Sequence, residues 1–274
     1  MSARSNRDCA AVPIRPPKLL LLDLDGTVYR GADPIPGAAE TIGAIRAAGM
    51  RVLFVTNRAN RTVATVARQL RSLGIPCKRS DAITTAAAAA TYCAEQGGGR
   101  CFLIGGRGIR EAFAARGLES APDGPADWVV VSLDLRFSYA KLARATALIL
   151  GGARFVATNP DRLITIGDAL FPEAGPLIAA VRTATGIEPT IIGKPSPKLL
   201  QEALRVAGCA PEEALVVGDC LDTDIAAAAA ADIPSCLLLT GVSTCADAER
   251  SHLRPDTICA NWAELRGKLL LGCT

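Results

Sequence analysis

"KLLLLDLDGTVYRG", from Lys18 to Gly31, runs four leucines directly into two aspartates that stand one residue apart. The short apolar run is typical of a buried strand. Two carboxylates placed so close together repel each other and require water or a cation. The stretch therefore predicts a buried strand whose end carries a charged site.

The same strand pattern recurs along the chain. Segments of helical periodicity lie between the apolar runs, and three of them (37–49, 61–74 and 196–208) end in Ala-Gly or Leu-Gly, as helices often do. Apolar strands that alternate with helices are typical of parallel sheets covered on both faces, so we predict an α/β fold. The predicted strands are 19–22, 51–55, 101–104, 128–133, 154–157, 214–217, 235–239 and 257–260.

Composition narrows the class of protein. The net charge of the 274 residues is only +3, and no basic block is interleaved with aromatics, so a nucleic-acid partner is not expected. The ten cysteines are scattered without a C-x-x-C pair, and the single histidine, His252, lies in a polar stretch, which disfavours a disulfide scaffold and a zinc site. No apolar segment reaches the roughly 18 residues of a membrane span. We expect a cytoplasmic protein with no membrane partner.

Several polar side chains follow predicted strands at the point where each strand ends. In open α/β sheets ligands bind beyond the carboxyl ends of the strands, so we expect these side chains to converge, together with a lysine that precedes the helix at 196–208. They are Asp23, Asp25, Thr56, Asp219, Asp222, Asp224 and Lys194.

This combination of groups indicates phosphoryl transfer. Mg²⁺ would relieve the repulsion among the carboxylates and leave room for a phosphate oxygen. Asp23 can attack phosphorus, and Asp25 can protonate the leaving oxygen and then accept a proton from water. Thr56, the backbone N–H of Asn57 and Lys194 supply hydrogen bonds and positive charge. An ordinary Asp-rich turn would explain the first aspartate pair but not the second cluster at Asp219.

The order of the motifs resembles that of the haloacid dehalogenase-like (HAD) phosphatases. The resemblance extends to subfamily IIA, which includes NagD-type, 4-nitrophenyl, phosphoglycolate, glycerol-phosphate and pyridoxal-phosphate phosphatases. The motifs are "DLDGT" (Asp23–Thr27), "VTN" (Val55–Asn57), "GKP" (Gly193–Pro195) and "GDCLDTD" (Gly218–Asp224), with further support from "ATNPD" (Ala157–Asp161) and "LLLTGVST" (Leu237–Thr244).

The resemblance implies a domain organisation. We expect a Rossmann-like core from residues 18–79 and 190–274, with a large α/β cap inserted at 80–189. Residues 1–17, which are polar and end in prolines, are expected to form a flexible arm. Caps of this type also allow a homodimer.

The resemblance also implies roles for individual residues. Mg²⁺ would be bound by the side chains of Asp23 and Asp219 and by the backbone carbonyl of Asp25, with Asp224 supporting the metal. Asp23 would be the nucleophile and Asp25 the general acid and base, assisted by Thr56 and Lys194. The residues assigned to substrate binding are Gly26, Thr27, Asn57, Arg58, Asn159 and Asp161.

Some of these assignments have a simpler alternative. Asn159 and Asp161 end a predicted cap strand and either face the leaving group or only form a turn. Arg58 either clamps a carboxylate or second phosphate of the substrate or is a surface charge.

The chain departs from the subfamily pattern at several positions. Arg58 and Ala59 replace Asn-Ser after the second motif, and Cys220 replaces an arginine. "PEAG" (Pro172–Gly175) stands where Pro-Gly-x-Gly is usual, and Ala228 and Asp232 stand where glycines are usual. Because these changes leave every group of the mechanism in place, we expect them to affect the choice of substrate.

The expected function is Mg²⁺-dependent hydrolysis of a small phosphate ester through an aspartyl-phosphate. We expect 4-nitrophenyl phosphate to be accepted, and phosphoglycolate, glycerol 3-phosphate, sugar phosphates and nucleotides are candidate substrates. A dehalogenase or phosphonate hydrolase of the same superfamily and a non-catalytic regulatory protein on the same fold are the alternatives. Both are disfavoured, the first because Asp25 supplies the acid that ester cleavage requires and the second because Asp23, Asp25, Lys194 and Asp219 are all present.

Overall fold

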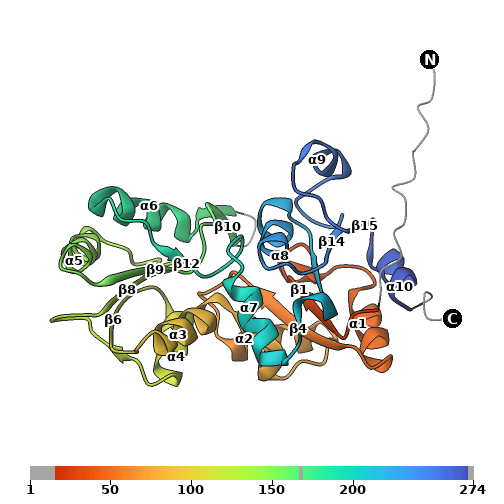
Figure 1. The fold of residues 1–274 in the computed structure, drawn as a ribbon, viewed down its shortest axis with the longest axis horizontal. Helices are drawn as coiled ribbons and strands as arrows, with labels where there is room; N and C mark the ends of the chain where they lie inside the picture. The colour runs from red at the N-terminus through yellow and green to blue at the C-terminus, as the bar shows by residue number, and fades with distance from the viewer. Residues whose placement is uncertain (1–15, 167–168, 271–274) are drawn as a thin grey trace, which may run out of the picture.

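The computed structural model describes residues 16–166 and 169–270, which form two lobes, each built on its own parallel sheet (Figure 1). Most of the arm predicted at 1–17 lies outside these residues. The two parallel sheets with their helices confirm the predicted α/β fold.

The larger sheet has the strand order β15-β14-β13-β1-β4-β5, with every pair parallel. One face is covered by α1, α2 and α10, whose apolar residues pack with those of β1 and β4. The other face is covered by α7, α8 and α3. The bounds are β1 (Leu19–Leu22), β4 (Arg51–Thr56), β5 (Ala82–Thr84), β13 (Ala214–Gly218), β14 (Ser235–Leu238), β15 (Thr257–Cys259), α1 (Ala38–Ala47), α2 (Val63–Ser72), α3 (Thr85–Glu95), α7 (Lys198–Ala207), α8 (Ala226–Ala230) and α10 (Trp262–Leu270).

The second sheet has the order β12-β9-β8-β6-β7 and is also parallel. Its residues pack against α5 and α6 on one face and against α3 and α4 on the other. The bounds are β6 (Arg100–Ile104), β7 (Glu119–Ser120), β8 (Trp128–Val131), β9 (Arg154–Ala157), β12 (Thr190–Ile191), α4 (Arg107–Ala115), α5 (Tyr139–Leu150) and α6 (Ala174–Thr185).

Helix α3 joins the two lobes. Its alanines belong to one buried cluster that includes residues of both sheets, such as Leu21 and Trp128. Small side chains let the helix lie close to its neighbours on both sides. The alanine run at 86–90 is therefore a packing surface.

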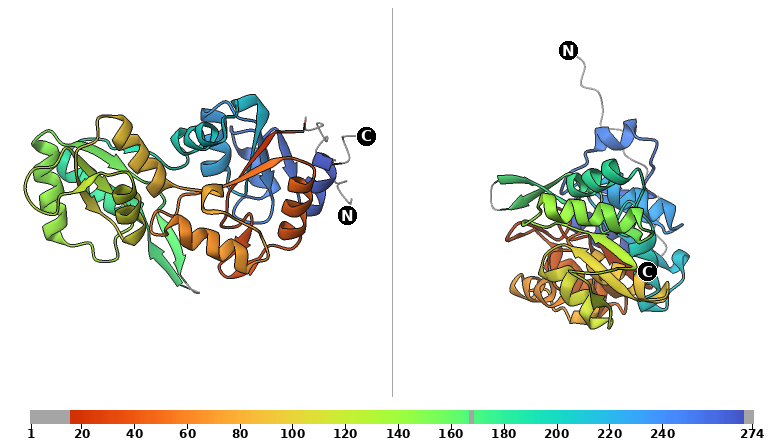
Figure 2. Two further views of the ribbon diagram at one scale, coloured as in Figure 1. Left: turned by 90° about the horizontal axis from the view of Figure 1, so that it is seen from below. Right: turned by 90° about the vertical axis from the view of Figure 1, so that its left-hand side faces the viewer.

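Two antiparallel hairpins and several short helices complete the fold. The hairpin β10–β11 lies where the two lobes meet (Figure 2). The bounds are β2 (Tyr29–Arg30), β3 (Asp33–Pro34), β10 (Leu163–Ile166), β11 (Ala169–Pro172), α9 (Cys245–Arg250), the 3₁₀ turns η1 (Arg79–Asp81) and η2 (Pro211–Glu213), and the π-helical turn η3 (Leu221–Ile225).

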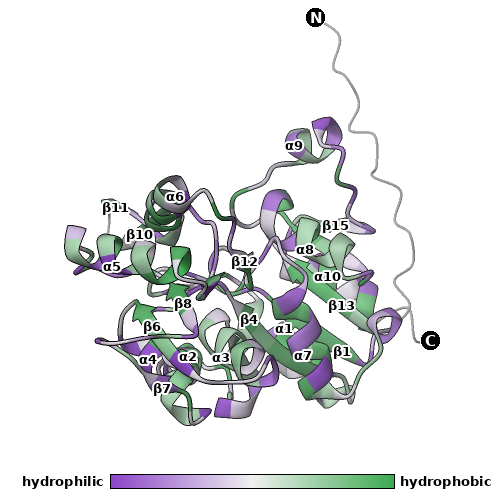
Figure 3. Ribbon diagram, turned by 60° about the vertical axis from the view of Figure 1, so that its left-hand side comes forward, coloured by the Kyte–Doolittle hydropathy of each residue, from purple (hydrophilic) through white to green (hydrophobic). Residues whose placement is uncertain are grey.

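Each strand predicted from an apolar run is present, and the central strands lie as hydrophobic ribbons inside the two lobes (Figure 3). The strands that the sequence did not reveal, β5, β7, β12 and the hairpins, are short or partly polar. Of the eight cysteines among the described residues, five are buried, as expected of small apolar side chains: Cys77, Cys93, Cys101, Cys236 and Cys259. Within 16–166 and 169–270, none of the helices combines the length and hydrophobicity of a membrane-spanning segment.

Candidate active site

The site is positioned by three neighbouring strands. β1 lies between β4 and β13, with Leu22 opposite Phe54 on one side and Val217 on the other. Asp23 follows β1, Thr56 ends β4, and Asp219 follows β13, so parallel pairing brings their side chains to one edge. A cavity of about 680 Å³ opens there, and residues of both lobes line it.

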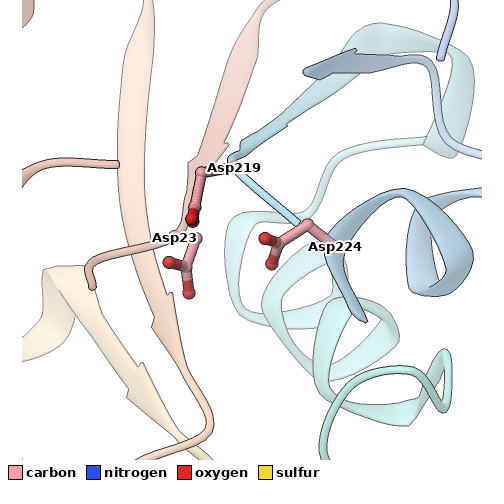
Figure 4. Close-up of side chains that lie close together, drawn as sticks. All are labelled: Asp23, Asp219 and Asp224. Carbon is pink, nitrogen blue, oxygen red and sulfur yellow. The ribbon is translucent and has the colours of Figure 1, made fainter. Parts of the chain in front are cut away.

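Three buried carboxylates form the floor of the site (Figure 4). Asp23, Asp219 and Asp224 are 8%, 2% and 1% exposed, and one oxygen from each lies within 4.8 Å of the others. Burial raises the pKa of Asp23 well above its ordinary value; Lys194 opposes this rise, while Asp224 and Asp219 add to it. Burial and the charge of Asp224 raise the pKa of Asp219 to about 6. A divalent cation would offset this cost by favouring the charged carboxylates.

Lys194 provides a buried positive charge between two of these carboxylates. Its ammonium donates hydrogen bonds to Oδ1 of Asp23 and, at 2.5 Å, to Oδ1 of Asp224. Burial alone would lower the pKa of Lys194, but Asp224 and Asp23 raise it, and the net shift is upward. The lysine therefore keeps its charge at neutral pH.

Asp224 is in direct contact with Lys194. Its second oxygen, Oδ2, accepts a hydrogen bond from the backbone N–H of Cys220 at 3.2 Å. Each oxygen of Asp224 is therefore engaged by the chain itself. Asp224 holds the lysine and also belongs to the carboxylate cluster that could hold a metal ion, so its role in supporting the metal stays a prediction.

Asp219 is held by the residues around it. The Thr27 hydroxyl donates to its Oδ1 at 3.1 Å, and the backbone N–H of Val242 donates to its Oδ2 at 2.7 Å. A Cβ on Gly26 or Gly241 would lie 2.4 or 1.8 Å from Oδ2, so only glycine fits at these positions. Gly26 and Thr27, assigned to the substrate from the sequence, thus lie against Asp219 and are absent from the cavity lining.

Asn57 connects the two lobes beside the site. Its Oδ1 accepts a hydrogen bond from the backbone N–H of Lys194 at 2.9 Å. Its Nδ2 donates to the Lys194 carbonyl and to Oδ2 of Asp161, both at 3.0 Å. The Asn57 side chain is therefore a structural link, and Asp161 reaches the cavity from the lobe of the second sheet.

Asp161, Asn159 and Glu173 form a second polar group on that lobe. The Nδ2 of Asn159 donates to Oδ2 of Asp161 at 2.8 Å and to Oε2 of Glu173 at 2.9 Å. Asn159 is fully buried and does not line the cavity, whereas both carboxylates do. Glu173 was not predicted; the departure at "PEAG" was the signal that marked it. Burial raises the pKa of Glu173 to about 7.

Arg58 is paired with the predicted general acid. Its Nε lies 2.7 Å from Oδ2 of Asp25, and the side chains are 19% and 33% exposed. The backbone N–H of Arg58 also donates to the Thr56 hydroxyl at 3.1 Å. Arg58 lines the cavity, as expected, but its charge is engaged by Asp25.

The donor set fits Mg²⁺. The cluster offers only oxygens, which Mg²⁺ prefers. Asp23 keeps Oδ2 free of hydrogen bonds within the described part of the chain, and Asp219 is oriented by donors that leave lone pairs available. These two carboxylates could hold the metal, with Asp224 beside them in the same cluster.

Comparisons with known proteins agree with this geometry. Residues 20–119 match the model of the haloacid dehalogenase-like hydrolases, and residues 191–265 match that of a related HAD-hydrolase-like family. The chain is 37% identical over 239 residues to the acid sugar phosphatase of Staphylococcus aureus strain USA300, covering 87% of this chain and 92% of the relative.

Solved structures are also similar. A glycerol phosphate phosphatase of Mycobacterium tuberculosis, solved in complex with magnesium, has a TM-score of 0.85 and 39% identity, over 91% of this chain and 77% of that one. NagD of E. coli K-12 has a TM-score of 0.86 and 30% identity, over 91% of this chain and 98% of that one.

Proposed function

Since the chain belongs to the haloacid dehalogenase-like hydrolases of subfamily IIA and is a phosphoric monoester hydrolase, we propose that it is a Mg²⁺-dependent phosphatase of small metabolites that works through an aspartyl-phosphate. The observation that carries the proposal is the buried arrangement of Asp23, Lys194 and Asp219, with Asp25 in the wall of the same cavity.

Two of the carboxylates perform the reaction. An oxygen of Asp23 forms a bond to phosphorus while the ester P–O bond breaks, and the Asp25 carboxyl gives its proton to the departing oxygen. Water then attacks phosphorus, one of its protons passes to Asp25, and the bond between phosphorus and Asp23 breaks to release phosphate.

Other residues of the chain hold the reacting groups in place. Lys194 orients Asp23 and contributes positive charge beside the transferring group. Mg²⁺, held by Asp23 and Asp219 and, by the family resemblance, by the Asp25 carbonyl, would neutralise the phosphate oxygens. Thr56, which ends β4, and the backbone N–H of the following Asn57 would contact the phosphate.

The lobe of the second sheet is proposed to act as a cap over the site. Pro160, Asp161, Leu163 and Glu173 line the same cavity as Asp23 and Asp219. A lobe in this position would exclude water and contact the leaving group. The cytoplasmic location stays a prediction from the cysteine pattern.

The proposal is tested by phosphate release from 4-nitrophenyl phosphate and glycerol 3-phosphate, in Mg²⁺ and in EDTA. We expect release only with the metal, and we expect Asp23→Asn to lower kcat by roughly a thousandfold or more, because the amide is no nucleophile. The exposed Asp123→Asn is the matched control. Mg²⁺ binding without phosphate release from any ester would instead support the regulatory protein.

A further inference from the structure

A buried carboxylate with an unused oxygen lies in the wall of the cavity on the second lobe. Glu173 precedes α6 and is 3% exposed, yet it lines the cavity together with Asp23 and Lys194. Its Oε2 accepts hydrogen bonds from Asn159 and from the backbone N–H of Ala174. Among the described residues, no group donates to Oε1. Because Glu173 lines the cavity and its Oε1 has no donor, this oxygen is available to a ligand there.

Asp161 offers a second such oxygen beside it. Oδ2 of Asp161 accepts hydrogen bonds from Asn57 and Asn159, whereas Oδ1 has no donor within 16–166 and 169–270. The same Asn159 amide holds both carboxylates, and its own oxygen accepts from the Thr158 hydroxyl at 2.8 Å, which fixes its orientation. The wall therefore presents two positioned acceptors.

The positive charges that line the cavity do not neutralise this wall. Lys194 is bound to Asp23 and Asp224, and Arg58 is bound to Asp25. Arg162 lines the cavity too, but its side chain belongs to an exposed residue at the rim. A negatively charged leaving group would lose water and meet the carboxylates of Glu173 and Asp161, which is the kind of contact that rejects a ligand.

We propose, as an extension of the proposed phosphatase function, that Glu173 and Asp161 bind a hydroxyl or ammonium group of the leaving group. The enzyme then prefers phosphate esters whose leaving group is an uncharged or cationic hydrogen-bond donor, and it disfavours esters with a second negative charge. Glu173 occupies the position where the subfamily usually has glycine, so this selection belongs to the present chain.

The electrostatics of the wall are consistent with this assignment. Burial, followed by the nearby charge of Asp161, raises the pKa of Glu173, while Arg58 lowers it. A hydrogen-bond donor of the substrate would offset the cost of burying the charged Glu173 carboxylate, which is the cost that raises its pKa.

The test compares three small substrates that differ mainly in the leaving group: phosphoethanolamine, glycerol 3-phosphate and phosphoglycolate. For the wild-type protein we expect kcat/KM to be lowest for phosphoglycolate. In Glu173→Gln the carboxylate charge is removed at nearly constant shape. The ratio of kcat/KM for phosphoglycolate to that for phosphoethanolamine should rise roughly tenfold or more, given the usual strength of charged hydrogen bonds. Glu119→Gln, an exposed carboxylate on the same lobe, should leave this ratio as it is.

The outcomes separate this proposal from the phosphatase function. A wild-type preference for phosphoglycolate, or a ratio that moves less than about twofold in Glu173→Gln, would overturn the proposal while turnover and its loss in Asp23→Asn still support a phosphatase. If Glu173→Gln does not fold, Glu173→Asp keeps the charge and should keep the wild-type order of substrates. The wild-type order by itself still decides the question.

Discussion

Arg58 shows how one residue alters the site without changing its chemistry. The guanidinium lies 2.7 Å from the Asp25 carboxylate and so limits where the general acid can point. From the sequence, an arginine at this position, where the subfamily usually has asparagine, is expected either to clamp an anionic substrate or to be a surface charge. In the structure its charge is engaged by Asp25, so its effect should fall on proton transfer.

We therefore expect Arg58→Asn to act according to the leaving group. Alkyl phosphates such as glycerol 3-phosphate need a proton on the departing oxygen, so their kcat should fall roughly 10- to 100-fold. 4-Nitrophenolate leaves without a proton, so its kcat should fall much less. Steady-state kinetics with both substrates measure the difference, and the exposed Arg68→Asn is the control. An equal fall for both substrates would show that Arg58 does not act through Asp25.

Glu173 predicts a pH dependence of stability. Its pKa rises from 4.5 to about 7 on folding, so the folded protein binds more protons than the unfolded chain between these values. The stabilisation of the folded state that this proton binding contributes is complete below pH 4.5 and is lost as the pH rises through 7. Asp161 and Arg58 are the charged groups that face it.

Glu173→Gln should remove this dependence. Relative to wild type, the variant should gain up to about 3 kcal/mol in the free energy of unfolding between pH 4.5 and pH 8. Urea unfolding in EDTA at both pH values measures the gain, and Glu119→Gln controls for the loss of a carboxylate. A gain that does not depend on pH would contradict the raised pKa.

Among the elements of the fold, two segments at the carboxyl end of the larger sheet position Asp219 and Asp224. The π-helical turn η3 follows β13 and brings the Asp224 carboxylate into hydrogen-bond contact with Lys194. The loop after β14 brings Gly241 against Asp219 and lets Val242 donate its backbone N–H. The surroundings of Asp219, one of the two proposed metal ligands, are thus formed by chain segments that follow the adjacent strands β13 and β14.

Gly241→Ala tests whether the close approach of Gly241 fixes the position of the Asp219 carboxylate. A Cβ there would lie 1.8 Å from Oδ2 of Asp219, so the carboxylate must move. We expect the Mg²⁺ concentration for half-maximal activity to rise roughly tenfold or more, as measured by titrating the metal at saturating substrate. Gly43→Ala, in helix α1 with open space around it, is the control and should stabilise the protein by about 0.5–1 kcal/mol. An unchanged Mg²⁺ requirement would show that Mg²⁺ binding tolerates a shift of the Asp219 carboxylate.

At the scale of the whole molecule, the second lobe exposes apolar side chains that the first mostly lacks. They are Leu135, Tyr139, Leu150, Leu163, Leu170, Phe171 and Ile187. Exposed apolar groups of this size are typical of surfaces that bind a partner. They favour the homodimer through the cap that the family resemblance allows.

Light scattering during size-exclusion chromatography measures the mass in solution. We expect a dimer for the wild-type protein and a shift towards monomer in Tyr139→Glu and Leu170→Glu, because a charge would be buried without a partner. Val206→Glu, on helix α7 of the other lobe, is the control. A wild-type monomer at all concentrations would exclude this dimer.

Much of the architecture could be predicted from the sequence because its signals are local. The apolar runs mark the strands, and the parallel order of β4, β1 and β13 brings their ends together. Asp23, Thr56 and Asp219 therefore converge for a reason that is visible in the chain alone. The short strands β5 and β12 could not be predicted, because they carry too few apolar residues to form a pattern.

The amino-acid sequence is enough to predict the fold class, the polar groups at the strand ends and the positions where this chain departs from the family pattern. The contacts of those side chains appear only in the folded chain: Arg58 with Asp25, Gly26 and Thr27 with Asp219, and Glu173 with Asn159 in the cavity wall. The difference is one of range along the chain. Strand and helix patterns depend on neighbours along the chain, whereas these contacts depend on side-chain directions that are set when distant segments pack together.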